Sequence, residues 1–244
     1  MLLKFAKWLV GILLLPVCVV ASLVFWGLLQ AVAQAHGGAT VLPVPALALV
    51  GGFGLWMVIF ALFPSPARSY ILAHELTHAL WGLMMGASIS KISVHDDHGA
   101  VVLSKTNFLI TLAPYFFPLY TVLVIGLYYL LWLFYPVERY DLVWLGLIGF
   151  TWSFHLTFTV TALLQRQSDI RDQGRLFSYT VIYLANIIGI CAWVVLVSSA
   201  SPADVLRLTE RATYRTCGWC VHLVNVIEPR VRVVKASVMH ALNL

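Results

Sequence analysis

Charged side chains are scarce in this chain of 244 residues, because Asp, Glu, Lys and Arg make up only 10% of it and hydrophobic residues make up 61%. A typical soluble domain carries about 25% charged residues. The composition therefore excludes an ordinary soluble protein. The mean hydropathy of +0.91 instead predicts one membrane-embedded unit.

Cysteine is also scarce, with four residues in the chain. Cys18 and Cys191 lie within apolar runs, so no disulfide framework is expected. Cys217 and Cys220 form a lone CxxC pair without the βαβ setting of a thioredoxin-type site, which predicts reduced, non-catalytic thiols. The sequence also has no internal repeat, phosphate-cradling glycine loop or aromatic-and-basic surface, so nucleic acid is not an expected partner.

Long apolar runs predict an all-α, multi-pass membrane protein with one small β-hairpin. A helix needs about 20 mostly apolar residues to cross a bilayer. The candidate spans are residues 8–33, 44–63, 68–86, 107–134, 142–165 and 176–199. The first run continues past the length of a signal-peptide core, so we expect it to stay uncleaved. Residues 1–199 are thus predicted to form a six-span membrane domain.

The distribution of Lys and Arg predicts the orientation of these spans. With a cytoplasmic N-terminus, the inner segments hold Lys4, Lys7, Arg68, Arg139, Arg207, Arg211, Arg215, Arg230, Arg232 and Lys235, and the outer segments hold Lys91, Lys105, Arg166, Arg171 and Arg175. This excess favours cytoplasmic termini, and we expect a protein of the bacterial inner membrane. The tail, 200–244, alternates basic and apolar residues at helical spacing, which predicts an amphipathic helix on the cytoplasmic face.

One ionisable triplet interrupts the third apolar run, where residues 74–78 read His-Glu-Leu-Thr-His. Charged groups within a span are costly and indicate function. On a helix, His74 and His78 project from one face and can bind one zinc ion, while Glu75 acts as general base for a zinc-bound water. The alternative is a structural polar cluster between helices.

A polar island at 165–174 and a histidine in the preceding run offer a third metal ligand. Asp169 would complete a His-His-Asp site with an open position for water, provided the island folds back into the bundle. Otherwise the island is a simple connection. Asp172 is the reserve candidate. His155 lies mid-run, at the expected depth of the motif, and is either a competing ligand or a packing histidine.

The segment after the motif has the pattern of a β-hairpin. Apolar and β-branched residues in 89–94 and 100–105 flank an Asp-Asp-His-Gly turn. The hairpin is either a plain exposed loop or an edge strand that pairs with an extended substrate. His95 and His98 flank the turn and are expected to be solvated rather than to bind metal.

Two prolines and one asparagine interrupt the later runs. Pro114 and Pro118 lack N–H groups, so they predict a kink and freed carbonyl oxygens, either at a cavity near the motif or for packing alone. Asn186 stands alone among apolar residues, where an interhelical hydrogen bond is expected and a substrate clamp is the alternative.

Taken together, the motif, the hairpin, Leu-Ala-Pro-Tyr at 112–115 and Ser-Asp-Ile at 168–170 resemble the site-2 protease family of intramembrane metalloproteases, over roughly residues 60–186. The resemblance implies zinc bound by His74, His78 and Asp169, with Glu75 catalytic, and so favours Asp169 over His155. The chain has Asp-Ile where the family usually has Asp-Gly, and it has no PDZ-like insertion.

The expected function is therefore that of a zinc metalloendopeptidase that hydrolyses peptide bonds of membrane-embedded or membrane-adjacent substrates. Its expected partners are such a protein or peptide substrate and the lipid bilayer. The alternative is a non-catalytic membrane scaffold or partner-binding subunit. An intact Glu75 between two histidines favours the enzyme, because a scaffold needs no carboxylate there.

Overall fold

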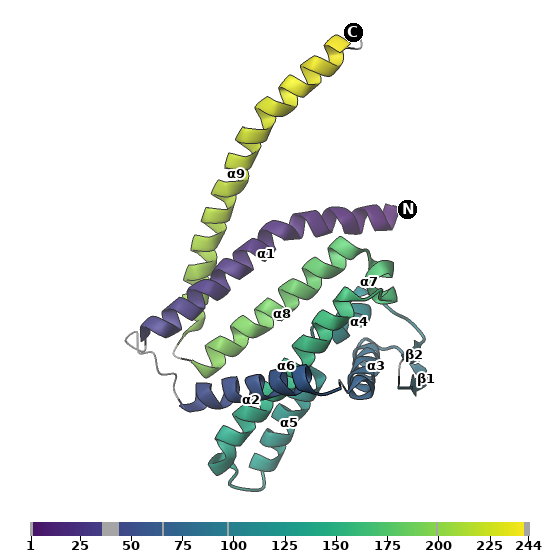
Figure 1. Cartoon of the computed structure of the whole chain (residues 1–244), viewed down its shortest axis with the longest axis vertical. Coiled ribbons are helices and arrows are strands. Elements are labelled where there is room, and N and C mark those ends of the chain that lie inside the picture. Colours follow the sequence, from purple (N-terminus) through teal and green to yellow (C-terminus); the bar gives the residue numbers. More distant parts are fainter. Residues whose placement is uncertain (1, 36–43, 65, 97, 199, 242–244) are drawn as a thin grey trace. The chain divides into compact units, whose positions relative to one another are not determined.

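The computed structural model describes residues 2–35, 44–64, 66–96, 98–198 and 200–241. The fold is mostly helical, with one two-stranded antiparallel sheet. In chain order (Figure 1) the elements are α1 (Leu2–Ala35), α2 (Val44–Leu62), α3 (Ala67–Met84), β1 (Ile89–Val94), β2 (Gly99–Leu103), α4 (Phe108–Leu112), the 3-10 helix η1 (Ala113–Tyr115), α5 (Leu119–Trp132), the 3-10 helix η2 (Glu138–Tyr140), α6 (Asp141–Leu164), α7 (Ser168–Gln173), α8 (Arg175–Val197) and α9 (Pro202–Ala241).

These elements form two compact units. The first comprises Met1–Ile12 and Ala39–Asn186, and the second comprises Leu13–Gly38 and Ile187–Leu244. The predicted division at residue 199 separates a membrane domain from a peripheral tail. It stays a prediction, because the two units are defined by contacts within the chain rather than by a membrane.

Four helices in the described part of the chain are long and apolar enough to cross a membrane. They are Leu2–Gln34, Val44–Leu62, Glu138–Leu164 and Arg175–Leu196. A fifth span results if the bent pair Phe108–Tyr115 and Leu119–Trp132 counts as one. The chain thus has the character of a membrane protein, and a sixth crossing, by α3, stays a prediction.

Within the first unit, α2 and α6 pack closely through glycines. A Cβ atom at position 52 would lie 1.9 Å from the carbonyl oxygen of Gly146, and one at position 149 would lie 2.0 Å from that of Leu49. Small residues allow such close backbone approach between apolar helices. Trp56 of α2 packs beside this contact against Phe154 and Phe158 of α6.

Helix α3 carries the His-Glu-Leu-Thr-His motif and ends in a defined cap. Gly86 has a φ of 73°, the left-handed conformation that glycine adopts without strain. Its N–H donates to the carbonyl of Leu83, and the next N–H, of Ala87, donates to that of Gly82. This Schellman pattern satisfies the last carbonyls and turns the chain toward β1.

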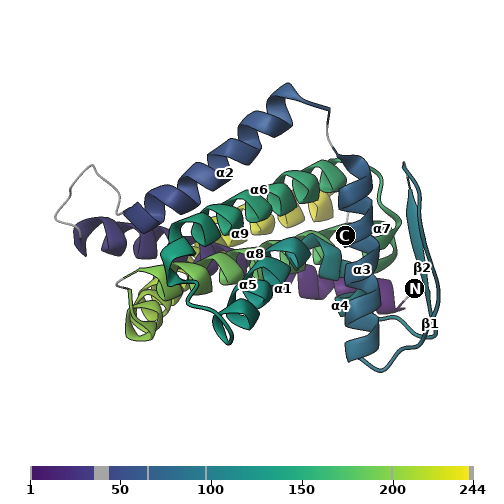
Figure 2. The ribbon, with the colours of Figure 1, turned by 90° about the horizontal axis from the view of Figure 1, so that it is seen from below.

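The orientation of α3 differs from that of α6. In Figure 1 α3 is seen along its axis and in Figure 2 along its length, whereas α6 lies lengthwise in both views. Helix α3 therefore crosses the direction of α6. The motif nevertheless lies beside the middle of α6, because His74 and Thr77 line one small cavity with Thr151, Phe154 and His155.

The predicted proline kink is a break in the fourth apolar run. Helix α4 continues into η1, and α5 then begins at Leu119 after a bend of 80°. Pro114 lies at the start of η1, and Pro118 precedes α5. Neither proline can donate a backbone hydrogen bond, which prevents one continuous helix.

The hairpin follows α3 directly, as Figure 2 shows. Strands β1 and β2 pair antiparallel, with Ile92 opposite Val101 and Val94 opposite Gly99. The rings of His95 and His98 stack at the turn, with their centroids 4.6 Å apart.

The second unit has its own apolar core, formed by Val24, Leu28, Ile187, Cys191 and Ala212. The first turns of α9 join this core, and Leu208 lies against Gly27. None of the described cysteines forms a disulfide, and Cys217 and Cys220 are exposed on α9. The lipid-facing role of the tail stays a prediction.

Candidate metal centre

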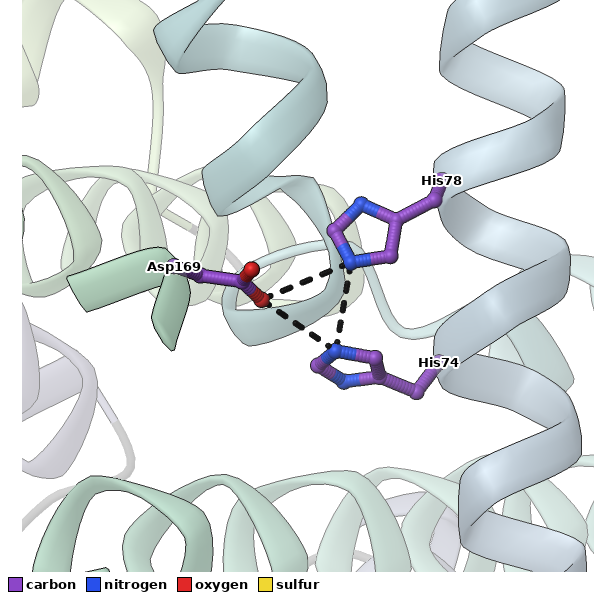
Figure 3. Close-up of side chains that lie close together, drawn as sticks. All are labelled: His74, His78 and Asp169. Atoms are coloured by element: carbon purple, nitrogen blue, oxygen red, sulfur yellow. Dashed lines mark hydrogen bonds and ion pairs between the residues drawn. The ribbon is translucent and has the colours of Figure 1, made fainter. Parts of the chain in front are cut away.

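Three side chains distant in the sequence meet in the first unit (Figure 3). The Nε2 atoms of His74 and His78 are 3.2 Å apart, and Oδ2 of Asp169 lies 3.5 Å from each of them. Across the described residues, these are the only three His, Cys, Asp or Glu side chains grouped closely enough to hold a metal ion. Two imidazoles and one carboxylate are a donor set that metal ions accept.

The helical spacing of α3 explains the histidine pair. His74 and His78 are four residues apart and so lie one above the other on the same face. Figure 3 shows both rings pointing from α3 toward Asp169. Thr77, between them, is buried and donates its hydroxyl to the carbonyl of Ala73, so it stays with its own helix.

Asp169 reaches the histidines because the polar island folds back. Gln165 and Gln167 have extended backbones, and the short helix α7 then carries Asp169 toward α3. Helices α3 and α6 do not run side by side as expected, because α3 crosses the direction of α6. His155 still lies level with the motif, since it lines a small cavity together with His74. Among the candidates, however, Asp169 is the one whose carboxylate lies 3.5 Å from both histidines.

A freed carbonyl orients His78. Nδ1 of His78 lies 2.9 Å from the carbonyl oxygen of Ile110. In a regular helix that oxygen would accept the N–H four residues on, but this position is Pro114, which has none. A carbonyl can only accept, so Nδ1 is the donor and Nε2 keeps its lone pair for a metal.

Tyrosines hold the other two members of the group. The hydroxyl of Tyr115 donates to Oδ2 of Asp169 at 3.0 Å. The hydroxyl of Tyr70 lies 3.3 Å from Nδ1 of His74, and the Tyr70 ring stacks on Phe158. Such outer contacts fix the direction in which a ligand atom points.

The setting of Asp169 favours its charged form. Burial alone would raise the pKa of this carboxyl, but when His74 and His78 are protonated, their hydrogen bonds and charges hold the pKa well below its ordinary value. An ionised carboxylate is the form that binds a metal ion.

Glu75 lies beside the group and is 7% exposed. A cavity of about 380 Å³ and one of about 650 Å³ are both lined by His74, Glu75, Gly99 and Gln167. Glu75 therefore lies where the two cavities adjoin. Gly99 makes this possible, because a Cβ atom there would lie 2.6 Å from Cγ and 2.8 Å from Oε1 of Glu75.

The other candidates lie outside the group of three. The side chain of Asp172 is 67% exposed and pairs with Arg171 at 3.7 Å. His155 is buried, and its side chain interacts with that of Asn186. His95 and His98 stay at the hairpin turn, although His98 also borders the smaller of the two cavities.

Sequence reasoning missed the orienting contacts of Ile110 and Tyr115. The signal for Ile110 was its place four residues before a proline, which leaves the Ile110 carbonyl oxygen without a backbone N–H donor. No sequence signal linked Tyr115 to Asp169, because the contact joins two segments 54 positions apart.

In comparisons with known proteins, the chain matched no family model, no curated protein and no solved structure.

Proposed function

We propose that this chain is an intramembrane zinc metallopeptidase. The observation that supports it most is the convergence of His74, His78 and Asp169 beside a buried Glu75. A catalytic zinc site has three protein ligands of this kind and one open position. The resemblance of the motif and of Ser-Asp-Ile to site-2 proteases supports the same reaction.

The roles of the side chains follow from their chemistry. When bound, zinc would polarise the scissile carbonyl and lower the pKa of a coordinated water to about 7. Glu75 takes the proton of that water and later gives it to the leaving amine. Its low exposure places the carboxylate inside the protein, and the two adjoining cavities leave room for the peptide on either side.

Strand β2 offers a way to bind an extended substrate. Residues 99–103 all line the larger cavity. The N–H of His95 donates to the carbonyl of His98, and hydrogen-bonded pairs alternate along an antiparallel ladder. The backbone groups of Gly99 and Val101 therefore face away from β1. A peptide that pairs with them would lie along the cavity beside Glu75.

The proposed setting is a bilayer crossed by six spans, with α3 as the least apolar of them. Both termini are proposed to be cytoplasmic, in the bacterial inner membrane, from the excess of Lys and Arg in the inner segments. A substrate would then be a membrane-embedded or membrane-adjacent protein whose helix unwinds to reach Glu75.

The proposal is tested with Glu75→Gln in proteoliposomes that contain fluorogenic single-span peptides. Loss of a general base typically costs about 100- to 10,000-fold in rate. We expect cleavage to fall by this amount while zinc content stays at the wild-type level. Cleavage at the wild-type rate would refute the mechanism. Zinc binding without cleavage by the wild-type protein would instead favour the scaffold.

A further inference from the structure

A chain of buried hydrogen bonds leads away from Asp169. It begins at Tyr115, which is fully buried and donates its hydroxyl to Oδ2 of Asp169 at 3.0 Å. The ring of Tyr115 also meets that of His74 edge-on, with centroids 5.3 Å apart. The position of Tyr115 therefore affects two members of the metal group.

Asn186 of α8 fixes the backbone of Tyr115. Its Nδ2 donates to the carbonyl of Tyr115 at 2.9 Å and to that of Ile182 at 2.9 Å. Tyr115 is the last residue of η1, and Pro118, three positions on, has no N–H to offer its carbonyl. A buried carbonyl without a donor is costly, so the asparagine supplies one across helices.

His155 of α6 holds Asn186 in turn. The side chain of His155 interacts with that of Asn186, and because both N–H groups of the Asn186 amide point at carbonyls, Oδ1 is the atom free to face the histidine. His155 is 8% exposed, and its other ring nitrogen, Nε2, has no hydrogen-bond partner among the described residues.

We propose that His155, Asn186 and Tyr115 form a positioning relay that holds Asp169 in place for metal binding. The inference rests on the metal site of the proposed function. It assigns a role to His155 and Asn186, which neither belong to the metal group nor line the two cavities beside Glu75.

Asp169 needs such support because its own helix is short. Helix α7 has six residues, between the extended Gln167 and Gly174, whose φ is 93°. A zinc ligand must lie about 2 Å from the metal, so a small displacement of α7 removes it. The relay links α7 through η1 to α8 and α6, both of which are long helices.

The test measures zinc affinity of the purified full-length protein by competition with a chelator. Changes in outer-shell contacts typically weaken metal binding about 10- to 100-fold. We expect Tyr115→Phe to cause a loss of this size and Asn186→Leu and His155→Leu to cause smaller losses. Asn186→Leu or His155→Leu combined with Tyr115→Phe should bind zinc no more weakly than Tyr115→Phe alone, because all three act through the Tyr115 hydroxyl.

Tyr179→Phe is the control, since the Tyr179 hydroxyl also donates a hydrogen bond, in its case to the carbonyl of Leu163, but lies outside the relay. The zinc affinity of Tyr179→Phe should equal that of the wild type. The thermal unfolding midpoint of each metal-free variant shows whether it still folds, and Tyr115→Phe, which removes only a hydroxyl group, should. Wild-type affinity in Tyr115→Phe, or losses that multiply in the double variants, would overturn the relay alone. A folded wild-type protein that binds no zinc would overturn the proposed metal site, and the relay with it.

Discussion

His78 and Ile110 are joined by a hydrogen bond that exists because of a third residue. Nδ1 of His78 lies 2.9 Å from the carbonyl oxygen of Ile110, and Pro114 leaves that oxygen without its helical donor. Pro114 therefore does more than bend the helix, because it also leaves a backbone carbonyl free to accept a hydrogen bond. It exposes a strong acceptor, which a ring nitrogen of the candidate metal site then occupies.

Pro114→Ala should weaken metal binding without touching a ligand. The new N–H at position 114 would compete for the carbonyl of Ile110, and His78 would lose its orienting acceptor. We expect a fall in zinc affinity of about 10-fold, the low end of outer-shell effects. Pro136→Ala, in the connection before α6, is the control and should bind zinc like the wild type. Equal affinity in Pro114→Ala would show that this contact does not orient His78.

Two of the three candidates for the third ligand, Asp169 and Asp172, can be separated by zinc occupancy. Asp169→Ala removes one of three ligands, so occupancy should fall sharply when the purified protein is analysed by atomic absorption. Asp172→Ala should leave occupancy unchanged, because that side chain is mostly exposed and pairs with Arg171. Retained zinc in Asp169→Ala together with loss in Asp172→Ala would reverse the assignment.

Gly99→Ala should separate catalysis from metal binding. The added methyl group would lie 2.6 Å from Cγ of Glu75, closer than real Cβ contacts allow, so the carboxylate or the hairpin must move. We expect cleavage to fall by about 100-fold or more, as when a general base is lost, with zinc content unchanged. Gly126→Ala is the control, since, apart from its chain neighbours and its own helix backbone, no atom of the described residues lies within 4 Å of its new methyl group. Normal cleavage by Gly99→Ala would mean that Glu75 tolerates the displacement.

The two edges of the hairpin can be compared with one substitution. Val101 of β2 and Ile92 of β1 lie opposite each other in a pair that is not hydrogen-bonded, so the backbone N–H of each points away from the partner strand. The N–H of Val101 points toward the larger cavity, and the N–H of Ile92 points away from it. Proline removes one such donor. Val101→Pro should therefore raise the KM for a membrane peptide, whereas Ile92→Pro should leave it unchanged. Equal effects of the two prolines would make the hairpin a passive cover.

Local features were accessible from the sequence. The helical spacing places His74 and His78 on one face, and the turn residues around His95 and His98 correspond to a hairpin in the structure. The proline pair predicts the break before α5, which is present. Each of these depends on residues within a few positions of one another, where backbone chemistry decides the outcome.

Long-range geometry was less accessible. The depth argument for His155 depended on helices that run side by side, and no local signal reveals that α3 crosses α6. The meeting of Tyr115 with Asp169 depends on how η1 and the six-residue helix α7 pack against each other. Such relations arise from packing of the whole unit, which a single sequence does not display.

The break before α5 couples two ligands mechanically. The carbonyl that faces His78 and the hydroxyl that faces Asp169 belong to one stretch of six residues, 110–115, immediately before the bend of 80°. Straightening that bend would displace both contacts together. A change confined to this stretch would therefore disturb both candidate ligands at once rather than one at a time.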